Sequence, residues 1–99
     1  MPGVARATVD HITCSTLNVI SAGSPDVFVN NNPVARIDDP TPGHPGGGPS
    51  SMKTGNGNNV YANGILICIQ GSENHPHGGD PHGPTPPTVA TASNNVFIG

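Results

Sequence analysis

Apolar residues along this chain gather into short runs, and the runs recur. Three runs share one pattern: Val-Phe-Val-Asn at residues 27–30, Val-Tyr-Ala-Asn at residues 60–63 and Val-Phe-Ile-Gly at residues 96–99. The only aromatic residues of the chain, Phe28, Tyr61 and Phe97, occupy the same place in these runs, at successive offsets of 33 and 36 residues. We interpret the pattern as a threefold internal repeat, and we expect the three aromatic residues to be equivalent packing residues.

A second apolar segment follows two of the runs, and each pair of segments predicts a β-hairpin. Segments 27–30 and 34–37 are joined across Asn31-Asn32, and asparagine tolerates the left-handed backbone of a tight turn. Segments 60–62 and 65–69 flank an Asn-Gly dipeptide, the strongest short hairpin signal. We therefore expect two hairpins with tight turns, one in each of these repeats.

The third repeat is split between the two ends of the sequence. Residues 3–6 read Gly-Val-Ala-Arg, and residues 33–36 read Pro-Val-Ala-Arg, so the N-terminal segment is a second half without a first half. The run at residues 96–99 is a first half without a second half. We expect residues 96–98 to pair with residues 4–6 as a third hairpin, which closes the repeats into a ring.

Long connectors separate the hairpins and are rich in Pro, Gly, His, Ser and Thr, at residues 7–26, 38–59 and 70–95. None has the apolar period of a helix. We expect short strand pieces at Val19-Ile20 and at Val89, and we expect prolines such as Pro40 to exclude regular structure nearby. The sequence thus predicts an all-β, small pseudo-threefold domain of short hairpins with long loops, a single domain over residues 1–99.

Composition limits what can hold such a domain together. With 32% hydrophobic residues, 14 Gly and 12 Pro in 99 residues, the core must be thin, and a metal, a crosslink or a partner is expected to support it. The Gly and Pro content leaves disorder as an alternative. The repeated apolar segments favour an ordered chain.

Charge and hydropathy exclude several function classes. The net charge is −3, and the only basic residues are Arg6, Arg36 and Lys53, which is too few for a nucleic-acid footprint. No apolar run reaches membrane-spanning length, and no basic segment precedes an apolar stretch at the start. We expect a chain made in the cytoplasm without a signal peptide or a transmembrane segment.

A candidate metal ligand follows each repeat. Eight residues after the ends of the second strands, at residues 6, 36 and 69, stand Cys14, His44 and His77. A closed structural zinc site needs four nitrogen or sulfur ligands, and the fourth ligand remains open among His11, His75 and His82. A single loop histidine beside Pro and Gly is usually a solvated surface residue, but the repeat favours convergence of the loops on one metal.

Other chemistry is weakly represented. Cys68 lies within an apolar segment and reads as a small buried residue, with a Cys14–Cys68 disulfide as the alternative. Asp38 and Asp39 precede Pro40, where aspartates commonly form turns. No G-x-S-x-G motif occurs, and a zinc ion with four protein ligands has no open position for water. We expect no enzymatic activity.

The Pro-Val-Ala-Arg segment at residues 33–36, preceded by the run at 27–30 and followed by Asp39, resembles the signature of the PAAR-repeat proteins. The resemblance covers nearly the whole chain, from Pro2 to the Val-Phe-Ile-Gly run at residues 96–99. The third unit departs from the signature and reads Leu-Ile-Cys-Ile at residues 66–69.

The resemblance implies a conical β-structure that caps the trimeric β-helical spike of a contractile phage tail or a type VI secretion system. It implies that the tip sharpens the spike and makes transient contact with the target cell envelope during puncture. It also implies one zinc ion near the apex, bound by three histidines and one cysteine. The matching residues are Cys14, His44 and His77, and the segment Pro81-His82-Gly83 matches the family's Pro-His-Gly loop, which makes His82 the fourth ligand.

Three unequal repeats in one polypeptide would present three similar faces to a threefold partner. We therefore expect one copy of this chain per spike homotrimer, with the strand-bearing end at the interface and the metal site pointing away. Exposed strand edges, which normally invite association, would then have an intended partner. The alternative is a stand-alone zinc-binding β module or adhesin that has no spike partner.

Overall fold

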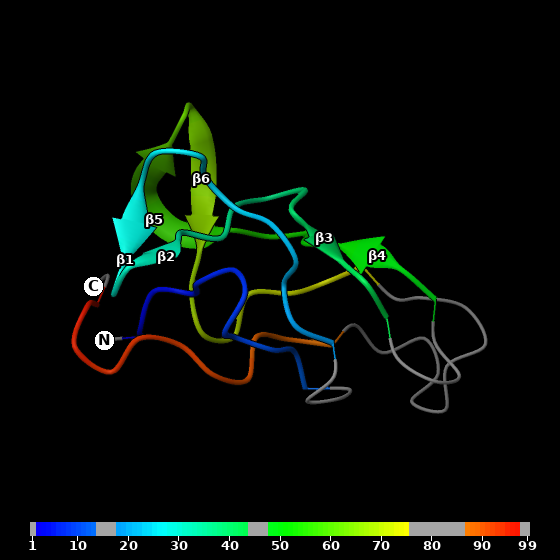
Figure 1. Cartoon of the computed structure of the whole chain (residues 1–99). Coiled ribbons are helices and arrows are strands. Elements are labelled where there is room, and N and C mark those ends of the chain that lie inside the picture. The colour runs from blue at the N-terminus through cyan, green and yellow to red at the C-terminus, as the bar shows by residue number, and fades with distance from the viewer. Residues whose placement is uncertain (1, 14–17, 44–47, 76–86, 98–99) are drawn as a thin grey trace.

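The computed structural model describes residues 2–13, 18–43, 48–75 and 87–97 (Figure 1). Over these residues the chain forms short strands and no helix, and so no helix that is long and apolar enough to cross a membrane. The strands are β1 (Phe28–Val29), β2 (Asn32–Pro33), β3 (Pro40–Thr41), β4 (Ser50–Ser51), β5 (Asn56–Ala62) and β6 (Ile65–Cys68). The predicted all-β class is confirmed.

The strands form three antiparallel pairs, β1 with β2, β3 with β4 and β5 with β6. The two predicted hairpins are β1–β2 and β5–β6. Residues Asn30 and Asn31 have φ values of 52° and 66°, and Asn63 and Gly64 have φ values of 57° and 76°. Two consecutive residues with positive φ are typical of type I′ turns, which match the twist of hairpin strands. Asn and Gly supply this geometry at low cost.

The register of the first hairpin differs from the prediction by two residues. Phe28 pairs with Pro33 and Val29 pairs with Asn32, so the second strand begins at Asn32 instead of residue 34. The reason is that the turn is formed by Asn30 and Asn31 and not by Asn31 and Asn32.

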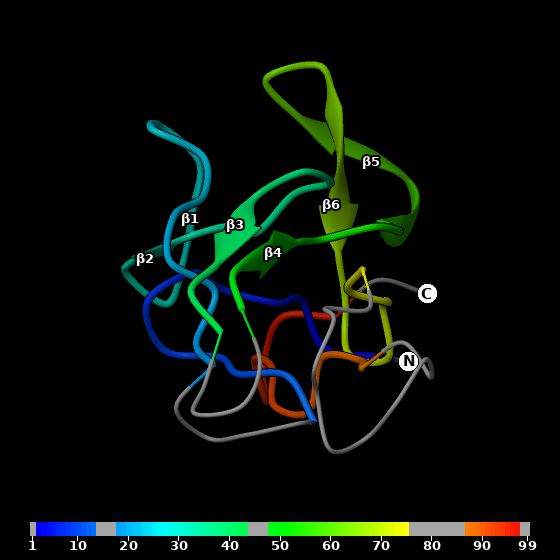
Figure 2. The same ribbon diagram turned by 90° about the vertical axis from the view of Figure 1, so that its right-hand side faces the viewer.

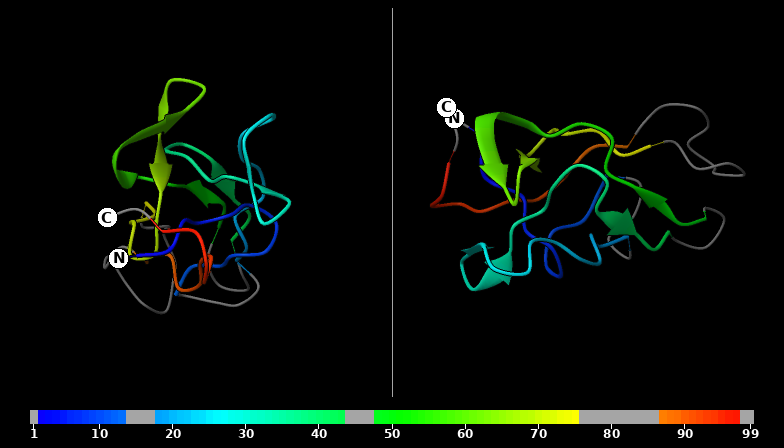
Figure 3. Two further views of the ribbon diagram at one scale, coloured as in Figure 1. Left: turned by 90° about the vertical axis from the view of Figure 1, so that its left-hand side faces the viewer. Right: turned by 90° about the horizontal axis from the view of Figure 1, so that it is seen from above.

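The two ends of the sequence pair, as expected, but Phe97 pairs with Gly3, which lies outside the predicted residues 4–6. Gly3 and Phe97 form an antiparallel bridge, the backbone N–H of Val4 donates to the carbonyl of Val96 at 3.0 Å, and that of Ser93 donates to the carbonyl of Val4 at 2.9 Å. Figure 3 shows the first and last described segments side by side. The split repeat is therefore completed by segments from opposite ends of the chain.

A closed ring of backbone hydrogen bonds joins the three repeats. The N–H of Ala35 donates to the carbonyl of Ala5 at 3.0 Å, the N–H of Cys68 donates to Ala35 at 2.8 Å, and the N–H of Ala5 donates to Cys68 at 3.0 Å. Around it lie three antiparallel bridges, Arg6 with Val34, Arg36 with Ile67 and Val4 with Ile69. We call this arrangement the backbone ring. Each repeat thus contacts both of the others.

The backbone ring divides the core into two clusters, because successive side chains of a strand point to opposite faces. On the hairpin side, Val4, Val34, Ala62 and Ile67 pack together, with Val29 and Val96 against them. On the other side lies a larger cluster of Ala5, Ala7, Ile12, Ile20, Ala35, Met52, Cys68 and Val89. The core is thin, as the composition predicts.

Cys68 is fully buried in the larger cluster, as predicted. It is a free thiol whose Sγ lies 3.5 Å from the carbonyl oxygen of Thr54, so the alternative of a disulfide with Cys14 does not hold. Burial raises the pKa of Cys68 to about 12.

The connectors are more regular than expected. Each one leaves the backbone ring and returns antiparallel to itself, through the bridge of His11 with Val19, the β3–β4 pair, and the bridge of Glu73 with Thr88. We call the segments that leave the ring the outgoing arms and those that come back the return arms.

Val19 and Val89 form bridges, as predicted, whereas Pro40 begins β3, which contradicts the expectation that it excludes regular structure. A proline is tolerated at the first residue of a strand.

The arms and the hairpins occupy opposite ends of the molecule. The chain measures 33 × 23 × 22 Å along its principal axes. Figures 1 and 3 show β1, β2, β5 and β6 at one end of the long axis and β3 and β4 toward the other. Figure 2 shows β3 and β4 side by side, with the described parts of the other connectors beneath them.

Candidate functional site

The four predicted zinc ligands, Cys14, His44, His77 and His82, lie outside the described residues. Among the residues that the structure describes, no group of three or more His, Cys, Asp or Glu side chains is placed to hold a metal ion. The alternative fourth ligands His11 and His75 are described. The described residues that lie next to the predicted ligands in sequence are those of the arms, so the arms are the part of the structure that bears on the metal prediction.

The arms of different connectors are hydrogen-bonded to one another near their described ends. The N–H of Thr13 donates to the carbonyl of Thr88 at 2.7 Å, and the N–H of His75 donates to the carbonyl of Ser51 at 2.9 Å. These bonds join the first connector to the third and the third to the second. Pro42 occupies the corresponding place in the second connector and has no N–H to donate.

The outgoing arms reveal a register shift that the sequence analysis missed. The N–H groups of Ile20, Met52 and Val89 donate, in that order, to the carbonyls of Asp10, Asp39 and Ser72. The three acceptor residues are therefore structurally equivalent. Asp10 follows Arg6 by four residues, whereas Asp39 and Ser72 follow Arg36 and Ile69 by three. The first connector therefore carries one extra residue.

The extra residue changes how the predicted ligands align. Thr13 and His75 make equivalent backbone hydrogen bonds and therefore occupy equivalent positions in their arms. Cys14 follows Thr13 by one residue, whereas His77 follows His75 by two. The equal spacing of eight residues thus does not mean equal structural positions. The ligand set itself stays a prediction.

The two described histidines differ in position. His11 is half-buried, its Nδ1 lies 3.1 Å from the carbonyl oxygen of Ile12, and its backbone N–H donates to Thr91 Oγ1 at 3.4 Å. By register it corresponds to Glu73, two residues closer to the backbone ring than His75. His75 is exposed at the last described position of its outgoing arm. Of these two alternatives, His75 is the one nearer to the arm ends.

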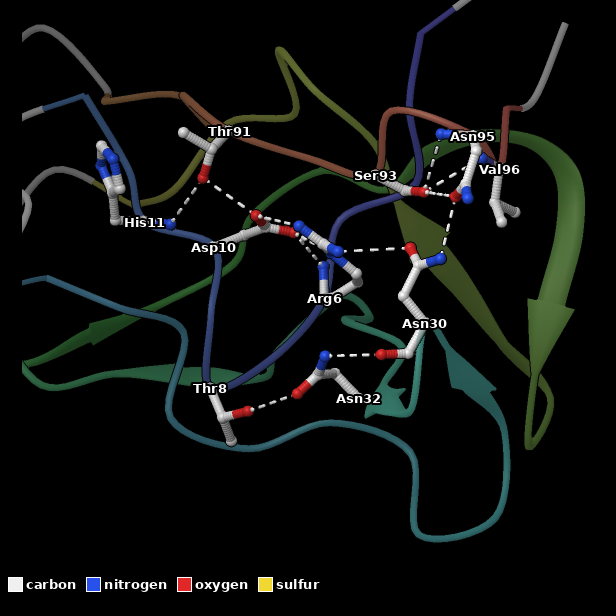
Figure 4. A network of polar contacts seen from close by, with 10 residues as sticks. All are labelled: Arg6, Thr8, Asp10, His11, Asn30, Asn32, Thr91, Ser93, Asn95 and Val96. Atoms are coloured by element: carbon white, nitrogen blue, oxygen red, sulfur yellow. Dashed lines mark hydrogen bonds and ion pairs between the residues drawn. The ribbon is translucent and has the colours of Figure 1, made fainter.

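A network centred on Arg6 connects the first connector to two hairpins (Figure 4). The Arg6 Nε and Nη2 atoms donate to both oxygens of the buried Asp10 at 2.9 and 3.0 Å, which raises the pKa of Arg6. Arg6 Nη1 donates to Asn30 Oδ1 at 3.2 Å, and Asn30 Nδ2 donates to Asn95 Oδ1 at 2.8 Å. The network holds the β1–β2 turn against the C-terminal segment.

A second network repeats this arrangement around Arg36. Its backbone N–H, Nε and Nη2 donate to Asp39 at 2.7, 3.2 and 3.1 Å, and its Nη1 donates to Asn63 Oδ1 at 3.1 Å. Asn63 Nδ2 donates to Asp26 Oδ1 at 2.7 Å, which lowers the pKa of Asp26 together with a bond from Ser24. The β5–β6 turn is thereby attached to the turn before β1.

The third repeat replaces this charge pair with neutral groups. Ile69 stands where the other repeats have arginine, and its backbone N–H donates to Ser72 Oγ at 3.0 Å. The sequence analysis treated Asp39 as a turn former and did not find these networks. The signal was present in the spacing, since an aspartate follows each arginine by three or four residues.

Apolar side chains are exposed on the hairpins. Phe28, Tyr61 and Phe97 are 55%, 58% and 45% exposed, so they are not packed within this chain, and the expectation that they pack there is wrong. They are equivalent in their exposure instead. Val27 and Val60, which precede Phe28 and Tyr61, and Ile65, the first residue of β6, are also exposed. We call these six residues the apolar hairpin surface.

No protein-family model matches this chain, and no similar curated protein is found. Its function is therefore argued from the geometry and from the sequence pattern.

Proposed function

We propose that this chain is a structural tip protein that caps the end of a homotrimeric β-helical spike, in a contractile phage tail or a type VI secretion system. The observation that carries the proposal is the apolar hairpin surface. Each of the three repeats contributes one exposed aromatic side chain to it. Exposed apolar surface of this kind marks a binding site when it is contiguous.

The backbone ring supports a threefold partner. It relates the three repeats within one polypeptide, so a single chain offers three similar but unequal faces. One copy of this chain per spike homotrimer satisfies that geometry. The domain is a pseudo-threefold cone in this proposal, with the hairpins at the base and the connectors toward the point.

Docking would combine apolar contact with pairing of strand edges. β2 and β6 already pair with neighbouring repeats, since the N–H of Ala7 donates to the carbonyl of Pro33 and the N–H of Ile37 donates to that of Leu66. The outer strands of the two hairpins, β1 and β5, present the edges that a third strand can extend. Few charges are involved, since the chain has only three basic residues. We expect added salt to weaken the complex only slightly.

The zinc ion in this proposal is structural, and the chain has no catalytic role. Three histidines and one cysteine are a donor set that suits tetrahedral zinc, and they would come from Cys14, His44, His77 and His82. The hydrogen bonds between arms support this proposal, because they bring the stems of the three loops together. Zinc would stiffen the loops that meet the target envelope.

Co-purification tests the docking proposal directly. The chain is co-expressed with a trimeric β-helical spike protein from the same source, and the mass of the purified complex is measured. We expect one chain per spike trimer, and we expect Phe28→Ser and Tyr61→Ser to abolish the complex. Val9→Ser is the matched control, because Val9 is 45% exposed but lies in the first connector. A ratio of three chains to three spike chains would contradict the proposal, as would wild-type protein that fails to bind.

Elemental analysis tests the zinc proposal. We expect one equivalent of zinc per chain in protein purified without chelator, and a marked fall in the melting temperature after chelation, because the metal binds only the folded state. Substitution of His82 alone distinguishes the fourth ligand from His75 and His11. Zinc well below half an equivalent in the wild-type protein would rule out the site.

A further inference from the structure

Three polar side chains are buried next to the described ends of the arms. Asn18, Thr41 and Asn74 are 0%, 1% and 0% exposed, and each belongs to a different connector. We call them the polar layer. Thr41 precedes His44 by three residues, Asn74 precedes His77 by three, and Asn18 follows Cys14 by four. The polar layer therefore lies in the stems of the loops that carry the predicted ligands.

Two hydrogen bonds of the polar layer run between connectors. Asn18 Oδ1 accepts from the backbone N–H of Gly43 at 2.9 Å, which joins the first connector to the second. Thr41 Oγ1 donates to Asn74 Oδ1 at 3.2 Å, which joins the second connector to the third. Asn74 Nδ2 donates to the carbonyl of His75 at 3.1 Å. Side chains thus hold the backbone just before the loop that carries His77, at His75, and just before the loop that carries His44, at Gly43.

Burial of these groups has a cost that apolar residues would avoid. A buried amide or hydroxyl is unfavourable unless it is hydrogen-bonded, and the neighbouring cluster shows that Ile12, Met52 and Val89 fill the same region without polar atoms. Satisfied polar networks instead fix one arrangement of the backbone. That property matters most in segments rich in Gly and Pro, which have little secondary structure of their own to hold them.

We propose that Asn18, Thr41 and Asn74 are positioning residues for metal binding. They set the places from which the three loops extend, so that the loops reach one metal ion without a large loss of conformational freedom. This inference rests on the zinc site of the proposed function. It assigns to the polar layer a role that core packing alone does not require.

Substitutions at Thr41 test the inference. Thr41→Val keeps the volume of the side chain and removes the hydroxyl that donates to Asn74, whereas Thr41→Ser keeps the hydroxyl. Thr8→Val is the matched control: the Thr8 hydroxyl donates to Asn32 Oδ1 at 3.2 Å and contacts no candidate ligand. Asn18→Ser, which moves the acceptor away from Gly43, serves as a second variant if Thr41→Val does not fold.

Zinc affinity is measured by competition with a chromophoric chelator, and the absorption spectrum of the Co²⁺-substituted protein reports ligand geometry. We expect Thr41→Val and Asn18→Ser to bind zinc about tenfold more weakly or worse, with an altered Co²⁺ spectrum. Thr41→Ser and Thr8→Val should retain wild-type affinity and spectrum. The melting temperatures of the metal-free proteins show whether stability alone accounts for the change.

The outcomes separate this inference from the proposal on which it rests. Wild-type protein that binds no zinc would remove the metal site, and the positioning role with it. Wild-type protein that binds zinc while Thr41→Val and Asn18→Ser keep its affinity and spectrum would overturn only the positioning role. A loss of affinity equal in Thr41→Val and Thr8→Val would do the same.

Discussion

Asp39 offers a sharp test of the networks that hold the repeats together. Its carboxylate accepts three hydrogen bonds from Arg36, and the two side chains are only 8% and 15% exposed. Asp39→Asn replaces one acceptor oxygen by an NH₂ group that faces the donors of Arg36. It also leaves a mostly buried guanidinium without its counter-charge.

The expected loss is about 3 kcal/mol. Removing one partner of a buried pair costs roughly 3–5 kcal/mol, and we take the lower end because Arg36 keeps some contact with water. In a domain of this size each kcal/mol lowers the melting temperature by about 4–8 °C, so we expect a fall of about 12–24 °C. Asp38→Asn is the control, since Asp38 is exposed and Asn tolerates its φ of 72° as well as Asp does.

The third repeat supplies a rescue of this defect. Arg36→Ile combined with Asp39→Ser copies the pair Ile69 and Ser72, in which a hydroxyl accepts the backbone N–H and no charge is buried. The double variant should be more stable than Asp39→Asn and should lose only about 1 kcal/mol relative to the wild type, for the contacts of Arg36 with Asn63 and Gly23.

Thermal and denaturant unfolding at equal zinc content measure these differences, because bound metal itself changes the apparent stability. The reasoning fails if Asp39→Asn unfolds within about 0.5 kcal/mol of Asp38→Asn, which is the range of ordinary surface substitutions. It also fails if the double variant is no more stable than Asp39→Asn.

Three further predictions concern single positions. Cys68, whose pKa burial raises to about 12, should resist alkylation at pH 8 (about one unit below its usual pKa) in the folded protein and react after unfolding, as peptide masses will show. The bond from Asn63 lowers the pKa of Asp26, so Asp26 should stabilise the fold above its unfolded pKa of about 3.9 and lose that contribution as pH falls through the lower folded pKa. Asp26→Asn should flatten this part of the stability profile. Gly23→Ala would place a Cβ 2.5 Å from a backbone carbonyl oxygen and should destabilise by about 2 kcal/mol, whereas Gly48→Ala, with open space around its Cβ, should not.

The sequence was sufficient where local chemistry decides the structure. Asn63-Gly64 and the asparagines after β1 predict tight turns because few other residues accept their backbone geometry. The closing of the split repeat also followed from the sequence, since each end of the sequence carries half of a repeat and the two halves complete each other. Gly3 and Phe97 pair accordingly.

The sequence was insufficient where pairing is short or distant. The arms form bridges of one or two residues, such as His11 with Val19, and so short a ladder leaves no alternating pattern to detect. The extra residue before Asp10 is visible only through the hydrogen bond from Ile20. The exposure of Phe28 follows from which face of the hairpin turns to the core, and a run of three apolar residues does not encode that face.

The backbone ring has a consequence for how this protein is made. The N–H of Ala5 needs the carbonyl of Cys68, and the N–H of Val4 needs the carbonyl of Val96, so the first repeat finds its partners only after the others have been translated. An emerging chain therefore holds unsatisfied edges and uncovered apolar residues until Val96 has left the ribosome. Folding of the three repeats is postponed until this segment has been synthesised, and nascent chains must be kept apart until then.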